Sequence, residues 1–524
     1  MQLPADRIRE IFHVPSYILG DVNDDKKITV TDIACTASHI LGTTPEPFIF
    51  KAADVNTDER ITVTDIAGIA NIILTGGSSS AVKSRTAKFA SKSANPSLEI
   101  VPFTLVPGTT SESVPLELIG EREDEFVGFQ CDIYLPAGIS WKKNSRGKLS
   151  APTFNAETER TTSEYHTVSA AVQEDGSIRV LCYSTENWEI LGKEGAVIDL
   201  PLTFDENLAP GVYDIIIKNT ELTNTDIESV NPEEYKVSVL VGSPDMASLS
   251  LYGDFTSKAI AEYNTALAEN TAVAAADLTG AYAIDGKKAF AFGNKNLLVY
   301  VKEETAVANT QNVVEGSECE NLVLTDKYSF NAPKSFTALK ASYARTASEN
   351  YGTIVLPFVP TKSDAQFYEF TGAGDNSLEF TEAIGTEANV PYLYMANGQG
   401  EFTATNAQVA ATPETLSAKA GEWTFTGTYS TNKFTTDDGV YALSSGSLYR
   451  NTGNLTVRPF RGYFTTDDAS AVKAYNISID GNTVSIDKLE NEAEAGEMYD
   501  LSGRKVNAPA KGIYIINNKK VLVK

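Results

Sequence analysis

The sequence predicts a multi-domain protein, with a small α module of paired loop–helix units at the front and mainly β domains of the sandwich type behind it. The chain has 524 residues, which is several times the length of a usual domain. A thirteen-residue segment is repeated near the N-terminus, and each copy precedes an apolar stretch with helical spacing. The rest of the chain alternates apolar and polar residues in short runs between turn-forming residues.

The charge balance restricts the partners that the chain can bind. The formal net charge is −26, from 69 acidic and 43 basic residues. A negative field of this size repels nucleic acid and anionic lipid, and it attracts divalent cations. We therefore expect no nucleic-acid partner. The sequence also contains no run of about eighteen apolar residues, so we expect no transmembrane segment.

The histidines and cysteines give little support for catalysis. The three histidines are far apart in the sequence and none has the H-E-x-x-H spacing of a zinc hydrolase. The four cysteines show no C-x-x-C spacing, so we predict neither a metal knuckle nor a redox motif. Cys131 and Cys182 fall in strand-like runs of the same region. They are either buried free thiols, which we favour, or a disulfide.

The repeat near the N-terminus predicts two calcium ions, one in each copy. Residues 21–33 read DVNDDKKITVTDI and residues 54–66 read DVNTDERITVTDI, with ten of thirteen positions identical. Calcium takes six to eight oxygen ligands, and a 12-residue loop supplies them from positions 1, 3, 5, 7, 9 and 12. Position 7 acts through its backbone carbonyl and position 9 through water. The predicted ligands are Asp21, Asn23, Asp25, Lys27, Thr29, Asp32, Asp54, Asn56, Asp58, Arg60, Thr62 and Asp65.

Each predicted loop crowds three carboxylates together, and these repel one another unless a cation neutralises them. Folding of the module should therefore be coupled to metal binding. The alternative is an acidic turn that only caps the following helix, with Asp32 and Asp65 as ordinary N-terminal charges. Two copies at matching spacing favour calcium. We expect the two apolar helices over about 33–41 and 66–74.

Residues 15–76, which contain both loops, closely resemble a type I dockerin, the small module that plugs into a cohesin. Position 6 of such loops is usually glycine, but here it is Lys26 and Glu59. A non-glycine residue there strains the turn and is expected to weaken calcium affinity. The resemblance implies that loop positions 10 and 11 select the partner. These residues are Val30, Thr31, Val63 and Thr64. Because the two pairs are identical, we expect either face of the module to dock equally well.

A flexible tether and a β-sandwich are predicted behind the module. Residues 77–97 are rich in glycine, serine and other small residues. The strands GFQCDIYLP and APGVYDIIIKN, within 98–242, carry a resemblance to a cohesin or a related carbohydrate-binding sandwich. The alternative is an immunoglobulin-like spacer without a partner. The resemblance implies docking on a cohesin-type β-sandwich, in cis or in trans. A coiled tether of about twenty residues spans roughly 25 Å, which permits the cis arrangement.

The C-terminal residues depart from the acidic average, with six basic residues and one acidic residue between 499 and 524. The segment YDLSGRKVNAPAKGIYIINNKKVLVK resembles the C-terminal sorting domain of proteins exported by the type IX route. The alternative is a terminal β-hairpin with a charged edge. The resemblance implies a secreted or cell-surface protein. Because MQLPADRIREIF lacks the apolar core of a signal peptide, we expect that peptide to lie outside the sequence shown.

These patterns together predict five segments along the chain. They are a dockerin-like calcium-binding domain over 1–78, a flexible linker over 79–97, a cohesin-like β-sandwich over 98–245, a β-rich region of one or two domains over 246–475, and a sorting-domain-like β tail over 476–524.

We expect a non-enzymatic extracellular or cell-surface protein that uses the calcium-loaded module for protein–protein assembly, in polysaccharide degradation or adhesion. The alternatives are a polysaccharide-acting hydrolase and a carbohydrate-binding surface protein with a glycan partner. Short β modules with no recognisable nucleophile and no marked carboxylate pair argue against the hydrolase. Glycan binding needs exposed aromatic residues. Trp141, Tyr183 and Trp188 are available, although we favour a buried position for them.

Overall fold

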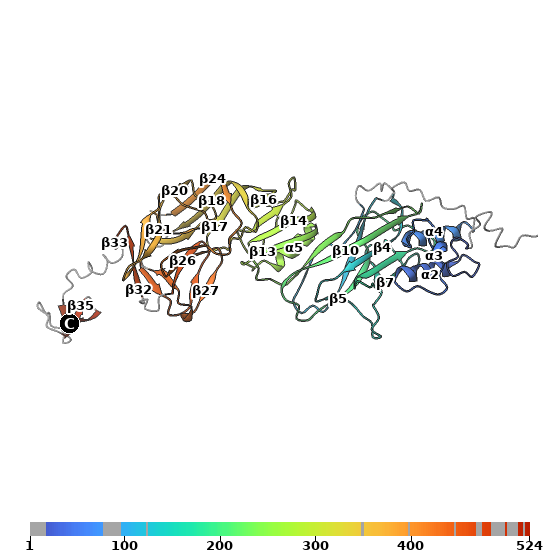
Figure 1. The fold of residues 1–524 in the computed structure, drawn as a ribbon, viewed down its shortest axis with the longest axis horizontal. Helices are drawn as coiled ribbons and strands as arrows, with labels where there is room; N and C mark the ends of the chain where they lie inside the picture. The colour runs from blue at the N-terminus through green and yellow to red at the C-terminus, as the bar shows by residue number, and fades with distance from the viewer. Residues whose placement is uncertain are drawn as a thin grey trace, which may run out of the picture. The chain divides into compact units, whose positions relative to one another are not determined.

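The chain forms two compact units, Met1–Glu318 and Cys319–Lys524 (Figure 1). Within the described residues, no helix has the length and apolar character that a membrane span requires. Most of the predicted linker, up to residue 95, lies outside the described residues. The computed structural model describes residues 17–76, 96–121, 124–346, 351–396, 399–444, 447–467, 474–483, 498–499, 512–516 and 519–523.

The helical module at the front of the first unit is built from α2 (Val30–Ile40), α3 (Phe50–Ala53) and α4 (Val63–Leu74). Helices α2 and α4 begin three residues earlier than the sequence predicts. Thr29 and Thr62 cap them, and the last aspartate of each loop completes a capping box as the third helical residue. Each loop therefore overlaps the first turn of its helix.

The two long helices pack against each other in one apolar core, but they are buried to different extents. Five of the eleven residues of α2 are buried, and they include the stripe of Ile33, Ala37 and Ile40. Nine of the twelve residues of α4 are buried. Helix α4 therefore packs against a second surface as well as against α2.

Two sheets form a β-sandwich behind the module. The five-stranded sheet has the order β1-β3-β9-β5, with β6 paired to β9, and the seven-stranded sheet has the order β2-β12-β10-β4-β8-β7, with β11 paired to β10. Their inner faces share one apolar core. The strands are β1 (Ser97–Glu99), β2 (Phe103–Leu105), β3 (Ser111–Ile119), β4 (Phe126–Tyr134), β5 (Ile139–Trp141), β6 (Thr153–Phe154), β7 (Thr167–Val172), β8 (Ile178–Tyr183), β9 (Ala196–Phe204), β10 (Gly211–Asn224), β11 (Ser229–Val230) and β12 (Tyr235–Val241).

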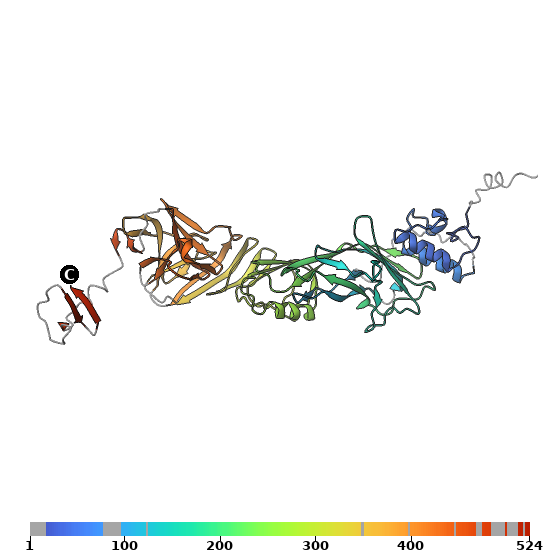
Figure 2. The same cartoon turned by 90° about the horizontal axis from the view of Figure 1, so that it is seen from below.

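The seven-stranded sheet is buried on both faces where β4, β8 and β10 pair. Successive residues of a strand point to opposite faces. On β4, Phe129 and Cys131 join the sandwich core, while Gln130 between them is buried on the other side. On β8, Leu181 and Tyr183 belong to the core of the helical module. The module therefore covers the outer face of this sheet, and both views show it there (Figures 1 and 2).

The first unit continues into a parallel sheet with the order β13-β14-β15-β16. Helix α5 (Ser257–Ala266) contributes Ile260 and Tyr263 to the apolar core of this region. The strands are β13 (Ser248–Phe255), β14 (Ala275–Ile284), β15 (Leu298–Val301) and β16 (Val313–Glu315).

The second unit is also built from strands, and its core is rich in aromatic rings. Phe425 and Phe464 stack there with ring centroids 4.1 Å apart. One sheet has the order β17-β18-β24-β20, a second has β19-β23-β21-β22-β32-β29-β28-β31-β26-β25 with β33 on β32, and β27 pairs with β30. The elements are β17 (Glu318–Thr325), β18 (Phe336–Thr346), β19 (Gly352–Val355), β20 (Lys362–Ser363), β21 (Ala365–Ala373), β22 (Ser377–Glu382), β23 (Pro391–Ala396), β24 (Gln399–Val409), β25 (Ser417–Ala420), β26 (Trp423–Thr428), β27 (Asn432–Phe434), η2 (Thr436–Asp438), β28 (Tyr441–Ser444), β29 (Ser447–Arg450), β30 (Leu455–Val457), β31 (Arg461–Thr466), β32 (Ala474–Ile479) and β33 (Asn482–Thr483).

The C-terminal segment forms a three-stranded antiparallel sheet from β34 (Met498–Tyr499), β35 (Gly512–Ile516) and β36 (Lys519–Val523). The residues between β34 and β35, which carry much of the resemblance to a sorting domain, lie outside the described residues. The sorting function of this segment stays a prediction.

The four cysteines are free thiols, and Cys131 and Cys182 are fully buried. They lie on adjacent strands but not opposite each other, because Cys131 faces Val180 and Cys182 faces Phe129. Burial raises the pKa of Cys182 to about 12, and it raises the pKa of Cys131 further.

We predict that Cys131 and Cys182 do not react with a maleimide in the native chain at pH 8, because both are buried as neutral thiols. Four thiols should titrate after denaturation without a reductant, as counted by mass spectrometry. A count of two in the denatured chain would show that a disulfide forms instead.

Candidate functional site

Backbone N–H groups hold the aspartates of each predicted calcium loop. In the first loop, the carboxylate of Asp21 accepts bonds from the N–H groups of Asp25 at 3.0 Å and Lys26 at 3.2 Å. Asp54 accepts the matching pair of bonds in the second loop. The Oδ1 atom of Asn23 accepts a bond from the N–H of Asp25 at 3.1 Å. The oxygen-bearing side chains at positions 1, 3 and 5 are therefore held close to one short stretch of backbone.

The aspartate at position 12 of each loop ties the loop to the following helix. Asp32 accepts N–H bonds from Val22 at 2.8 Å, Asn23 at 3.2 Å and Thr29 at 2.9 Å. Asp65 repeats this pattern in the second loop. The helix-capping role that the sequence offered as an alternative is thus present. It is compatible with metal binding, because an ionised carboxylate has about four lone-pair positions.

Four of the six aspartates that are predicted calcium ligands are buried without a cationic partner. Within the described residues, no lysine or arginine forms an ion pair with any of them. Burial raises the pKa of Asp65 to about 8, although backbone N–H bonds act in the opposite direction. Buried charges need a counter-charge or a metal. The four residues, with their exposed fractions, are Asp21 at 1%, Asp32 at 0%, Asp54 at 8% and Asp65 at 0%.

The donor set of each loop fits calcium, because it offers hard oxygen atoms and negative charge that the protein does not neutralise. No three histidine, cysteine, aspartate or glutamate side chains gather into a metal cluster in the part of the chain that the structure describes. This absence does not argue against calcium in the loops, because only half of the ligands predicted for each loop are carboxylates. At position 9, the hydroxyls of Thr29 and Thr62 accept bonds from the N–H groups of Thr31 and Thr64, at 3.2 and 3.3 Å.

The backbone at position 6 is left-handed in both loops, where glycine would be unstrained. Lys26 has φ of 68° and Glu59 has φ of 67°. L-residues pay a steric cost in this conformation because Cβ approaches the following carbonyl oxygen. The strain expected from the missing glycines is therefore present in the backbone.

The two loop–helix units, which are residues 21–41 and 54–74, differ sharply in exposure at the predicted partner-binding positions. Val30 is 58% exposed, whereas Val63 is 0% exposed. Thr31 is exposed, and Thr64 is buried. The start of α4 in the second unit faces the seven-stranded sheet, whereas the start of α2 in the first unit does not.

Glu221 of β10 makes the central polar contact between the module and the sheet. Its Oε1 atom accepts hydrogen bonds from the hydroxyls of Thr62 and Thr64, both at 2.6 Å. Its Oε2 atom lies 3.6 Å from the guanidinium of Arg60, which forms an ion pair but no hydrogen bond. The Glu221 side chain is 2% exposed. A buried carboxylate of the sheet thus accepts hydrogen bonds from two hydroxyls at the N-terminus of α4.

Three further polar contacts surround this centre. The Oε1 atom of Gln130 accepts the N–H of Val63 at 3.0 Å, which satisfies a free donor at the N-terminus of α4. Asn187 donates to the carbonyl of Ala67 at 3.0 Å. Arg179 donates to the carbonyl of Ile40 at 3.3 Å, at the C-terminal end of α2.

Small residues bring α4 close to the sheet. A Cβ added to Gly128 of β4 would lie 3.0 Å from a methyl group of Val63. A Cβ added to Gly68 of α4 would lie 2.9 Å from Val55 and 3.6 Å from Ile227. Gly128 therefore allows the close approach of α4 to the sheet, whereas Gly68 allows α4 to pack closely on Val55 within the module.

Among the aromatic residues considered for glycan binding, Trp141 and Tyr183 are buried, as the sequence favours. Trp188 instead is 48% exposed. It lies beside Tyr165, which is 38% exposed, with ring centroids 4.4 Å apart.

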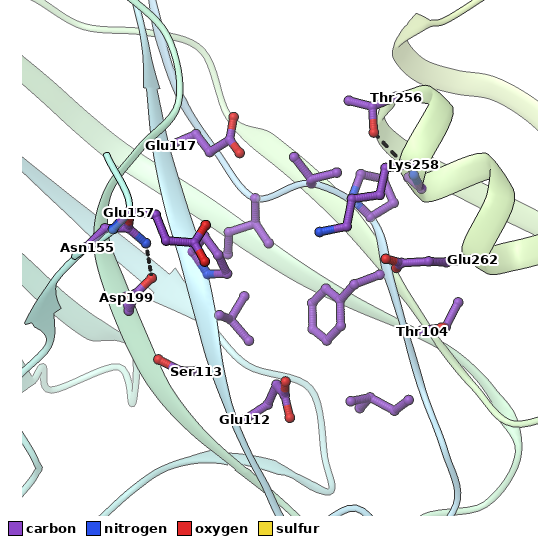
Figure 3. A pocket seen from close by; sticks show the side chains of 18 of the residues that line it. Thr104, Glu112, Ser113, Glu117, Asn155, Glu157, Asp199, Thr256, Lys258 and Glu262 are labelled. Carbon is purple, nitrogen blue, oxygen red and sulfur yellow. Dashed lines mark hydrogen bonds between the residues drawn. The ribbon is translucent and has the colours of Figure 1, made fainter. Parts of the chain in front are cut away.

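A large groove of the first unit, of about 980 Å³, lies elsewhere (Figure 3). It is lined by several carboxylates and by Lys258, and Asn155 donates to Asp199 at 2.8 Å on one wall. None of the predicted site residues lines this groove. Its carboxylates are Glu112, Glu117, Glu157, Asp199 and Glu262.

The sheet and loop residues that contact the module could not be predicted from the sequence. Glu221, Gln130, Asn187 and Arg179 lie at polar positions of strands or loops, and such positions usually face solvent. The one available signal is the polar alternation of these strands, and it does not distinguish a solvated face from a docked one.

Comparison with known proteins assigns residues 19–74 to the dockerin type I domain. No curated protein matches the chain. One similar solved structure is a type I cohesin–dockerin complex from Clostridium thermocellum, with 17% identity over 28% of this chain and 99% of that chain and a TM-score of 0.23. A type I cohesin from Pseudobacteroides cellulosolvens has 14% identity over 29% and 94%, with a TM-score of 0.23. A non-cellulosomal cohesin from Archaeoglobus fulgidus has 12% identity over 29% and 93%, with a TM-score of 0.22.

We predict that Lys26→Gly and Glu59→Gly each stabilise the calcium-loaded module by roughly 0.5–1 kcal/mol, because glycine removes the left-handed strain. Calcium titration and thermal unfolding of the full chain measure the effect. Lys27→Gly is the matched control, and it should destabilise, because Lys27 is not among the residues with positive φ. If Lys26→Gly and Lys27→Gly destabilise equally, position 6 carries no strain.

Proposed function

We propose that this chain is a calcium-dependent, non-enzymatic assembly protein of the cell exterior. Its dockerin-type module would bind a cohesin-type β-sandwich through the face that carries Val63 and Thr64. The observation that carries the proposal is the buried contact of Thr62 and Thr64 with the carboxylate of Glu221. Paired hydroxyls on a helix N-terminus and a carboxylate on a sheet face form a specific recognition pair.

Calcium would act in this proposal by neutralising the buried aspartates of both loops, one ion per loop. The ion would supply positive charge and fix the loop conformation. The position-12 aspartates also cap α2 and α4, so a fixed loop would stabilise the start of each helix. The proposed ligands are the twelve loop residues predicted from the sequence. The support is the burial of four loop carboxylates without a cationic partner.

An exterior location fits these loops. Calcium is close to millimolar outside cells, so strained loops with reduced affinity would still fill. The resemblance of the C-terminal segment to a sorting domain also supports an exterior location. In this proposal the remaining β domains act as spacers or ligand-binding faces, in adhesion or polysaccharide degradation.

We predict that the full chain binds one calcium ion per loop, as measured by isothermal titration calorimetry after chelator treatment. Asp25→Ala and Asp58→Ala should each weaken binding at least about tenfold at one site, because each removes a carboxylate ligand. Neither residue is buried, so the module core stays intact.

Asp24→Asn is the matched control for this experiment. Asp24 is an exposed loop carboxylate that pairs with Lys26, and it is not a proposed ligand. It should leave calcium binding unchanged. Equal losses in Asp24→Asn and Asp25→Ala would contradict the ligand assignment, and a wild-type chain without bound calcium would contradict the function.

A second candidate function is glycan binding, which the exposed pair of Tyr165 and Trp188 favours. Exposed aromatic rings provide stacking surfaces for the apolar faces of sugars. This function does not exclude assembly, because the pair lies outside the contact with Glu221.

We predict that Trp188→Ala abolishes retention of the full chain on an insoluble polysaccharide, while calcium binding stays unchanged. Leu191→Ala is the control, since Leu191 is a nearby apolar residue that is 61% exposed. If wild-type chain shows no retention on any polysaccharide tested, or if both variants lose it equally, the aromatic pair is not a glycan site.

A further inference from the structure

We infer that the partner of the second loop–helix unit is the sandwich of the same chain, so that the chain is self-docked and its seven-stranded sheet is closed to other dockerin-type modules. This inference rests on the proposed docking function, and it names the partner of that site. It also restricts docking to one of the two faces that the sequence presents as equivalent.

The chemistry of the contact supports a specific partner. Glu221, Gln130, Thr62 and Thr64 are all at most 4% exposed. The Oε1 atom of Glu221 accepts from both threonine hydroxyls, and the Oε1 atom of Gln130 accepts from the N–H of Val63, while the Oε2 atom of Glu221 has only the ion pair with Arg60. Buried polar groups are costly unless they are satisfied. The sandwich therefore presents an acceptor pattern that matches the donors of α4, rather than a general apolar surface.

The apolar part of the contact is continuous with the core of the module. Leu181 is 0% exposed and Tyr183 is 9% exposed, and both pack in the same cluster as Val63 and Ile66. Opening the contact would expose these side chains together. A closed state is thus favoured by apolar burial as well as by the hydrogen bonds.

Two sequence differences distinguish the second unit from the first near this contact. Position 7 of the loop is Lys27 in the first unit and Arg60 in the second, and Arg60 faces Glu221. Gly68 of α4 corresponds to Cys35 of α2. A Cβ at Gly68 would lie 2.9 Å from Val55 of the module itself and 3.6 Å from Ile227, which is an ordinary contact, so glycine at this position allows close packing of α4 on Val55.

Self-docking has a consequence for assembly. A dockerin-type module from another molecule needs the same acceptors, Glu221 and Gln130, and these are already bonded within the chain. An external module must therefore displace the internal one, which is present at the high effective concentration of a tethered partner. The free chain should be a closed monomer rather than a link in a head-to-tail polymer.

The test is amide hydrogen exchange of the full chain with calcium, comparing residues 60–67 with the equivalent residues 27–34 of the first unit. Residues 60–67 should exchange at least about tenfold more slowly than residues 27–34, because only residues 60–67 are covered by the sheet. The ratio should not change when the chain is diluted, since the contact is intramolecular.

Paired variants separate the two faces. Thr64→Asp places a carboxylate against Glu221 and should remove the extra protection, whereas Thr31→Asp at the exposed equivalent position should not. When Glu221→Lys is added to Thr64→Asp, a new ion pair between the two substituted residues should restore the extra protection. Thr64→Val, which keeps the shape and removes the hydroxyl, should lose part of the protection even if the charged variant unfolds.

The outcomes distinguish the inference from the function on which it rests. Equal loss in Thr31→Asp and Thr64→Asp, or protection that disappears on dilution, overturns self-docking while calcium-dependent docking stands. A wild-type chain that binds no calcium overturns the proposed function as well. Position 11 is not a proposed ligand, so both aspartate variants should still bind one calcium ion per loop.

Discussion

The buried carboxylate of Glu221 is the contact on which the arrangement of the first unit depends. Its side chain is 2% exposed, and a buried polar group is costly unless it is hydrogen-bonded. Two threonine hydroxyls donate to its Oε1 atom at 2.6 Å. Because Thr62 and Thr64 lie at the start of α4, these bonds decide which end of the helix meets β10. The rest of α4 then lies along the sheet, and Val63 fits against Gly128.

Calcium binding and docking share residues in this account. Thr62 and Arg60 belong to the second loop as proposed ligands, and both also face Glu221. Asp65 holds the N–H groups of Val55 and Thr62 and so connects the loop to the first turn of α4. A loop that loses its metal would leave buried carboxylates uncompensated, and the hydroxyls that meet Glu221 would lose their fixed positions. Metal binding is therefore expected to set the strength of docking.

Local signals in the sequence predicted much of this unit. Oxygen donors at alternating positions placed the loops, and apolar spacing placed both helices, although a capping box starts each one three residues earlier than apolar spacing indicates. The choice of face could not be predicted, because both units read TVTDI. That choice depends on Glu221, which lies 157 residues from Thr64. In the sequence, the buried polar positions of β4, β8 and β10 cannot be distinguished from those of a solvent-exposed strand face. Helix α3 has only four residues and no side-chain cap, so it left no pattern to find.

Energy transfer between dyes on the module and on the sandwich tests the central claim most directly. With Cys35 replaced by serine, the labels would be placed at the exposed residues Val30 of α2 and Val172 of β7, at nanomolar chain concentration. A self-docked chain should show high transfer with calcium. This transfer should be unaffected by excess unlabelled chain and should fall when a chelator is added. Low transfer with calcium, or transfer that unlabelled chain competes away, would contradict self-docking.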